Sequence, residues 1–196
     1  MSASLQTEGG TLTYGIGEYE RQFEQIRSDA EALTAGLTHK QFNWRPAAGV
    51  WSISECLCHL NISGEWWLRE LDRAMEAARQ RGWRGDGKFR VGWLASRFIR
   101  SNEPPVRRRF RAPRRFTPVD DQPLSAVRPT FMHLQSQFIE RLKDAAGLDL
   151  TRTKVSTPVP LLKLSLGPCF GLIAAHERRH LWQARQVRNE ERFPLS

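Results

Sequence analysis

Apolar residues recur at intervals of three and four positions in four long stretches of this sequence. This is the spacing of an amphipathic helix whose apolar side faces a core. The first stretch shows the pattern in the series Phe23, Ile26, Ala30, Leu33 and Leu37. The four predicted helices span residues 19–37, 53–81, 124–147 and 168–189.

Strand-like alternation of apolar and polar residues is not convincing anywhere in the chain, and no repeat period is visible. The 196 residues are enough for one domain with a core of its own. We therefore predict an all-α protein, a four-helix bundle that forms a single domain over residues 1–196. Residues 1–16 are small and polar, and we expect them to be a loosely held N-terminal segment.

Positive charge is concentrated in one segment that follows the second predicted helix. The chain has a net charge of +9, and residues 84–115 carry eleven arginines and lysines against Asp86 and Glu103. The rest of the chain has equal numbers of basic and acidic residues. Prolines between residues 104 and 118 exclude a long regular element, although a short helix fits residues 92–100. We predict an irregular basic insertion over residues 82–120, between the second and third helices and outside the core.

Composition excludes several classes of protein. Hydrophobic residues make up 40% of the chain and charged residues 26%, which is typical of a soluble globular protein. No run approaches the roughly 18 apolar residues of a membrane span, and no signal-peptide pattern begins the chain. Cys56, Cys58 and Cys169 do not form a disulfide framework, so we expect buried thiols. The expected protein is cytoplasmic and has no membrane partner.

Two histidines, His176 and His180, lie one helical turn apart in the fourth predicted helix. Both fall on its apolar side, where a methyl group would normally face the core. A buried imidazole without a partner costs free energy, but one divalent ion can bind two rings at positions i and i+4. The pair therefore predicts two ligands of a metal site. Chance is the competing explanation, because five randomly placed histidines would give such a pair about one time in ten.

His59 is the candidate for the third ligand. It lies two turns inside the second helix, whose start is marked by Ser52 and Glu55 in the pattern of a capping box. Taken alone, His59 fits equally well as a core-edge residue bonded to a carbonyl group. Together with the pair it completes a set of three imidazoles, which suits zinc, nickel or iron but not magnesium. We expect His133 to be a packed or surface residue rather than a fourth ligand.

The run from His176 through Glu177 to His180 also matches the motif of zinc peptidases, in which the glutamate is the general base. The extended motif needs a histidine at the position of Gln186, or a distant downstream glutamate that the chain lacks. A ferritin-type di-iron centre needs two Glu-x-x-His elements, and only one is present. We expect neither site, and we interpret Glu177 as a solvated or helix-pairing carboxylate.

These residues together resemble the DinB superfamily, whose YfiT-like members are metal-dependent hydrolases. The motifs that carry the resemblance are Trp44-Arg45-Pro46, Trp51-Ser52-Ile53, Cys58-His59-Leu60 and His176-Glu177-x-x-His180-Leu181-x-Gln183. The resemblance covers most of the chain outside residues 1–16 and 82–120. It implies a four-helix bundle that holds a divalent metal with His59, His176 and His180. Relatives include bacillithiol transferases and mycothiol-dependent maleylpyruvate isomerase, and many others have no assigned reaction.

Two functions from different classes follow. The favoured one is a metal-dependent enzyme, a hydrolase or thiol S-transferase, in which an open metal position takes water or a thiolate and attacks a small electrophilic substrate. A low-molecular-weight thiol would then be a co-substrate, and no catalytic general base can be assigned. The alternative is a protein with a structural metal that binds nucleic acid or another anionic partner through residues 84–115. A homodimer is compatible with both. The aromatic residues that would stack on bases in the alternative are Phe89, Trp93, Phe98, Phe110 and Phe116.

Overall fold

The computed structural model describes residues 7–8, 11–106 and 112–195, and most of them lie in helices. The helices are α1 (Ile16–Thr34), α2 (His39–Asn43), α3 (Ile53–Gln80), α4 (Trp93–Asn102), α5 (Leu124–Ala145) and α6 (Leu166–Arg188), with a 3-10 helix η1 (Arg114–Phe116). The strands are β1 (Thr7–Glu8), β2 (Thr11–Gly15), β3 (Lys88–Arg90), β4 (Lys154–Ser156) and β5 (Lys163–Ser165). The prediction of an all-α protein is confirmed.

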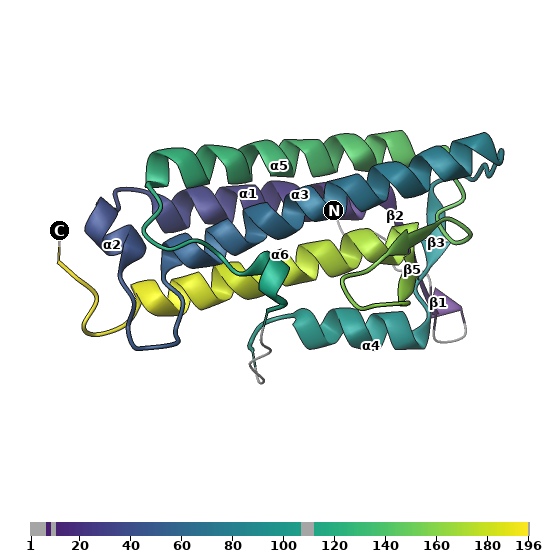
Figure 1. Ribbon diagram of the computed structural model, residues 1–196. Coiled ribbons are helices and arrows are strands. Elements are labelled where there is room, and N and C mark those ends of the chain that lie inside the picture. Colours follow the sequence, from purple (N-terminus) through teal and green to yellow (C-terminus); the bar gives the residue numbers. More distant parts are fainter. Residues whose placement is uncertain (1–6, 9–10, 107–111, 196) are drawn as a thin grey trace.

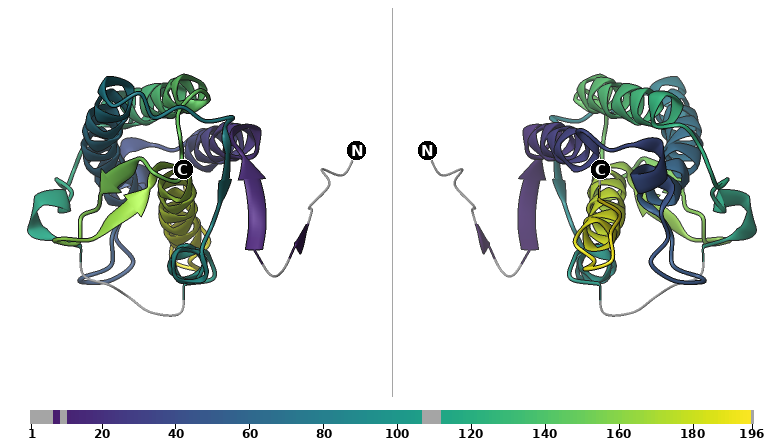
Figure 2. Two further views of the ribbon diagram at one scale, coloured as in Figure 1. Left: turned by 90° about the vertical axis from the view of Figure 1, so that its right-hand side faces the viewer. Right: turned by 90° about the vertical axis from the view of Figure 1, so that its left-hand side faces the viewer.

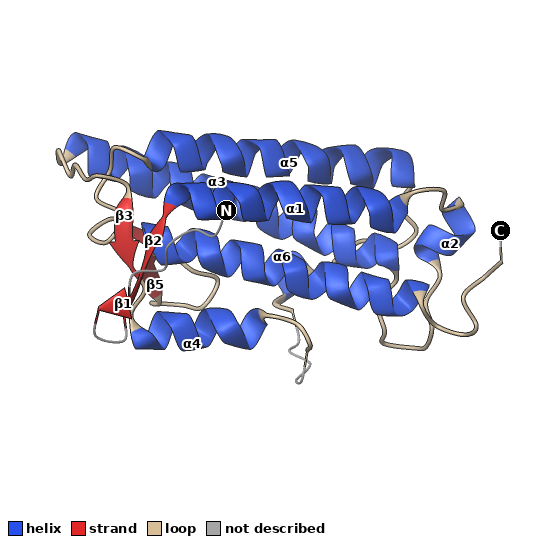
Figure 3. Ribbon diagram, turned by 180° about the vertical axis from the view of Figure 1, so that it is seen from behind, coloured by secondary structure: helices blue, strands red, loops and turns tan. Residues whose placement is uncertain are grey.

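The long helices α1, α3, α5 and α6 lie side by side along one direction (Figures 1 and 3). α3 packs against α5 and α6, and α1 packs against the same two helices. Their facing sides bury the residues that the helical period predicted, such as Phe23, Leu71, Phe138 and Ile173. The ends of these helices agree with the predicted ranges to within about three residues. No helix among the described residues is long and apolar enough to cross a membrane.

The start of α3 is fixed by the predicted capping box. The backbone N–H of Glu55 donates to Ser52 Oγ (3.1 Å), and the backbone N–H of Ser52 donates to the Glu55 carboxylate (2.9 Å). Arg45 donates two further hydrogen bonds to this carboxylate, at 2.7 and 2.6 Å. Burial alone would raise the pKa of Glu55, but the hydrogen bonds from Arg45 and Ser52 hold it below its ordinary value. This anchored start sets the position of His59 one to two turns later.

Two small sheets correct the expectation that the chain has no strands. β2 pairs antiparallel with β1 on one side and with β3 on the other, and β4 pairs antiparallel with β5. Each strand has only two to five residues. Such lengths are too short for alternation to be recognised in a sequence.

The basic segment between α3 and α5 is more ordered than predicted, because it contains β3, α4 and η1. It also contributes to the core, since Phe89, Val91 and Phe116 are buried. Phe89 stacks on Tyr19 with ring centroids 5.8 Å apart, and a Cβ atom at Gly167 would collide with its ring. α4 instead lies outside the four long helices, against α6 (Figure 2). Residues 107–111, which include four of the arginines and Phe110, lie outside the described residues.

Candidate metal centre

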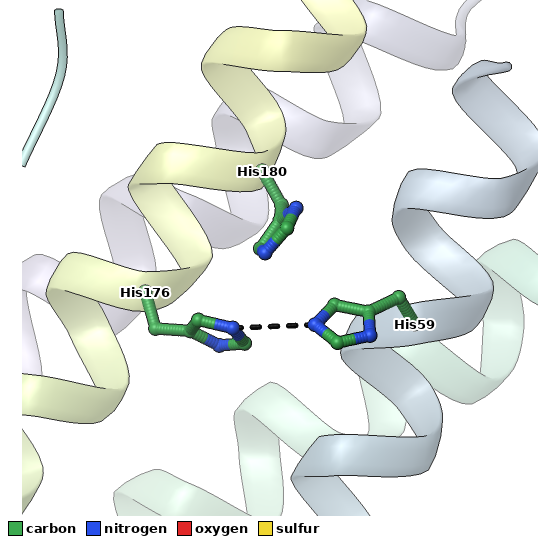
Figure 4. A group of neighbouring side chains, drawn as sticks. All are labelled: His59, His176 and His180. Atoms are coloured by element: carbon green, nitrogen blue, oxygen red, sulfur yellow. Dashed lines mark hydrogen bonds between the residues drawn. The ribbon is translucent and has the colours of Figure 1, made fainter. Parts of the chain in front are cut away.

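Three histidine rings meet between the first turns of α3 and the middle of α6. His59 comes from α3, and His176 and His180 come from successive turns of α6 (Figure 4). His59 Nε2 and His176 Nε2 lie 3.3 Å apart, and one nitrogen from each of the three rings lies within 4.8 Å of the others. The helical spacing of His176 and His180 and the packing of α3 on α6 therefore bring together the three residues that the sequence singled out.

The environment of the cluster is apolar. His59 and His180 are buried, and His176 keeps one partly exposed edge. Trp51 lies against two of the rings, with centroids 5.0 Å from His59 and 5.7 Å from His180. Phe116 contacts His59 edge-on at 6.4 Å. Of the three histidines, His176 is the one that is not fully buried.

The orientation of His59 is set by a backbone group of the basic segment. His59 Nδ1 lies 2.7 Å from the carbonyl oxygen of Phe116. A carbonyl oxygen only accepts, so Nδ1 carries the proton and Nε2 turns its lone pair toward the other two histidines. Metal-binding histidines commonly have their second nitrogen held in this way. The carbonyl partner expected for a core-edge histidine is thus present, but within a three-histidine cluster.

The three imidazoles are neutral at pH 7. Burial is the main cause that lowers the pKa of His176 to about 3, with smaller contributions from His59 and Arg179. Burial also lowers the pKa of His180 well below its ordinary value, and it lowers that of His59 against the opposing effect of the Phe116 carbonyl. Neutral rings keep the lone pairs that a metal needs.

The geometry and chemistry of this cluster fit a divalent ion. Because Nδ1 of His59 holds the proton, its Nε2 faces His176 Nε2 as an acceptor, so the 3.3 Å contact needs either an N–H donor at His176 Nε2 or a cation that both nitrogens bind. His180 Nδ1 is buried without a hydrogen bond to any described residue. Imidazole nitrogens are good ligands for zinc and its first-row neighbours. The three histidines could therefore hold one divalent metal.

Glu177 does not join this cluster, although it lies between the two α6 histidines in sequence. Its side chain is buried and accepts a 3.0 Å hydrogen bond from Gln135 Nε2 on α5. Burial raises the pKa of Glu177 to about 8. A peptidase base must face the metal, so this placement argues against the zinc-peptidase motif. Of the two expectations for Glu177, the solvated carboxylate is wrong, because the side chain is buried. The structure shows the other one, a contact with a neighbouring helix.

The other candidate ligands lie elsewhere. His133 is exposed on α5, as expected of a surface residue. The three cysteines are free and buried, and burial raises the pKa of each thiol, so they fill core space in the protonated form. Within the described ranges, no fourth histidine, cysteine or carboxylate joins the group formed by His59, His176 and His180.

Sequence reasoning missed the groups that surround the three histidines. Phe116 was considered only as an aromatic residue for nucleic acid, yet its carbonyl holds His59 and its ring is buried. Arg179, which the sequence did not single out, is buried and donates to the Ser101 carbonyl at 3.4 Å. Its spacing from His176, i to i+3, was the available signal.

Comparison with known proteins identifies the family of this chain. A search of curated proteins and a search of solved structures each gave no match. The family description that matches is that of the DinB superfamily, over residues 22–184. That range includes all of α3 and α5, the three histidines and the basic segment. A match over most of the length shows that this chain belongs to the DinB superfamily.

Proposed function

We propose that this protein is a metal-dependent enzyme whose divalent ion is bound by His59, His176 and His180. The observation that carries the proposal is the convergence of three neutral imidazoles without a fourth protein ligand among the described residues. Structural zinc sites are closed by four protein ligands, whereas catalytic sites have three and keep a position open. His176 is the partly exposed member of the group, and we place the substrate entrance beside it.

Zinc and nickel are the proposed metals, and iron is the third choice. An all-imidazole ligand set suits these ions, whereas magnesium and calcium prefer oxygen ligands. The buried cysteines do not contribute sulfur, because their thiols are protonated and lie outside the group.

The proposed reaction is thiol transfer to, or hydrolysis of, a small electrophilic substrate. The bound ion would act as a Lewis acid that lowers the pKa of a thiol or a water molecule at its open position. The chain itself contributes positioning: the Phe116 carbonyl keeps the Nδ1 proton of His59, and Trp51 shields two of the rings from water. Glu177 is not proposed as the base, because it faces α5.

Metal analysis of the purified protein is the direct test. We expect about one zinc or nickel ion per chain in the wild type and a sharp loss in His59→Ala and His180→Ala, since two imidazoles bind weakly. His133→Ala is the matched control, because His133 is exposed and far from the cluster in sequence. Unchanged stoichiometry in both ligand variants would remove the proposal. If the metal site is confirmed, screens for thiol transfer and for ester hydrolysis with the metal-loaded protein would distinguish the two proposed reactions.

A further inference from the structure

The outer face of α4 exposes apolar side chains that nothing in the described structure covers. Trp93 is 68% exposed, Leu94 is 74% exposed and Phe98 is 38% exposed. All three belong to α4, which packs against α6 at the edge of the molecule (Figures 1 and 2). Large apolar residues grouped in this way usually mark an interaction surface.

Basic side chains surround these apolar residues. Arg97 lies between Trp93 and Leu94 around the helix, and Arg100 lies on the other side of Trp93, and both arginines are exposed. Lys88 and Arg90 are exposed on β3, just before the helix. The face of α4 itself therefore combines Trp, Leu and Phe with two positive charges, and on the neighbouring β3 Lys88 pairs with Asp86 at 3.9 Å.

The opposite side of α4 is anchored, so the exposed residues are held in place. Ala95 and Ile99 pack against the core. Glu103 follows the helix and accepts two hydrogen bonds from Arg178 on α6, at 2.9 and 2.5 Å. Glu103 is also the only acidic residue between positions 87 and 106. Its pairing with Arg178 leaves the outer face without a negative charge of its own among the described residues.

The charge of the face excludes a second copy of the chain as the preferred occupant. A twofold contact would place the same surface against itself and bring Arg97 and Arg100 of both copies together. Nucleic acid would match the charge, but two of the aromatic residues suggested for base stacking, Phe89 and Phe116, are buried. Leu94, the most exposed of the three apolar residues, has no stacking role. An acidic protein remains, yet three exposed side chains are few for a stable protein interface.

We propose that the outer face of α4, defined by Trp93, Leu94, Arg97, Phe98 and Arg100, binds the surface of an anionic lipid bilayer. Trp and Phe settle at the boundary between headgroups and acyl chains, and Leu enters the apolar side of it. Arginine stems can lie along the same boundary while their guanidinium groups reach lipid phosphates. The proposal departs from the expectation of no membrane partner, and it does not depend on the metal site.

Sedimentation of the full-length protein with vesicles tests this proposal. The protein should sediment with vesicles of phosphatidylglycerol and phosphatidylcholine but not with vesicles of phosphatidylcholine alone. Added salt should lower the fraction of protein that sediments with the anionic vesicles. Removing one basic residue should weaken partitioning about fivefold, so the double variant Arg97→Gln/Arg100→Gln should lose about 25-fold. The double variant Trp93→Ser/Leu94→Ser should lose at least about tenfold. The matched control is Arg69→Gln/Arg128→Gln, which removes two exposed arginines from α3 and α5 and should bind as the wild type does.

Each other outcome would overturn the proposal. Absence of wild-type binding to anionic vesicles, or an equal loss in the control variant, would show that the face does not bind lipid. Binding of a short single-stranded DNA that depends on Arg97 and Arg100, without vesicle binding, would assign the face to nucleic acid. A dimer in solution that Trp93→Ser/Leu94→Ser dissociates, again without vesicle binding, would assign it to a second copy. All substituted side chains are exposed, and unchanged melting temperatures would confirm that the variants fold.

Discussion

At the scale of single residues, burial lowers the pKa of each histidine in the cluster and so keeps its ring neutral and able to bind a metal. A histidine in water has a pKa near 6.5, so protons compete with metals just below neutral pH. The pKa of His176 is about 3, and those of His59 and His180 are also lowered. Neutral rings are thus maintained by the fold itself. This has a cost in stability that depends on pH.

The free energy of unfolding of the metal-free protein should fall as the pH drops from about 6 to 4 because of His176. In this window the unfolded histidine binds a proton and the folded one, with a pKa of about 3, does not. The contribution is about 1.4 kcal/mol per pH unit. Urea unfolding with a chelator present should therefore show a shallower decline for His176→Gln than for the wild type. Parallel declines would contradict the lowered pKa.

Glu177 should show the opposite sign. Its folded pKa of about 8 exceeds the unfolded value, so the wild type loses stability as the pH rises from about 5 to 8. Glu177→Gln removes this loss, because an amide stays neutral beside Gln135. The variant should gain stability relative to the wild type across that range, by up to about 1.4 kcal/mol per pH unit. Its metal content should stay unchanged, and a loss of metal would point instead to a role of Glu177 at the cluster.

The histidine pair could be predicted from sequence, whereas the partner of His59 could not. His176 and His180 are near neighbours on one helix, and their spacing follows from helical geometry alone. The Phe116 carbonyl lies 57 positions after His59 and reaches it only through the conformation of η1. Backbone carbonyls also carry no residue-specific mark in a sequence.

The helices and the connections between them differ in how much the sequence reveals about each element. The long helices repeat the same apolar spacing over many turns, so their positions could be predicted. α2 has only five residues, and the strands have two to five, so the expected patterns had no room to repeat. β3 and the equally short η1 place Phe89 and Phe116, and the sequence analysis did not anticipate that either side chain is buried.

Phe116→Ala should weaken metal binding about 10- to 100-fold, because η1 would lose its buried anchor and the carbonyl would no longer hold His59 firmly. Competition with a fluorescent chelator measures the affinity. Arg114→Ala, an exposed neighbour in the same 3-10 helix, should leave it unchanged. Equal affinity in both variants would show that the Phe116 carbonyl does not position the ligand.

At the scale of the whole molecule, the basic segment has two parts. One part belongs to the core, and the other lies outside it. β3 inserts Phe89 beside Tyr19 and Gly167, while the outer face of α4 is exposed. The concentration of positive charge made the whole segment look like an insertion on the bundle. Two buried phenylalanines within it could not be distinguished from exposed ones by charge or proline content.

Phe89→Ala should lower the free energy of unfolding by about 3–5 kcal/mol, because it leaves a cavity in the core. Phe98→Ala, at an exposed position of the same segment, should change it by less than about 0.5 kcal/mol. Denaturant unfolding of both variants measures the difference. An equally small loss of stability in both variants would mean that Phe89 does not contribute to the core and that deletion of the segment would leave the bundle intact.

The histidine cluster joins positions that are far apart along the chain, since His59 and His176 are separated by 117 residues. An ion bound by both would act as a cross-link and would close a loop of that length. In the chain-entropy description, closing a loop of about 100 residues restricts the unfolded chain by roughly 4–5 kcal/mol. Metal occupancy would then set not only the chemistry of the cluster but also how rarely α3 and α6 separate.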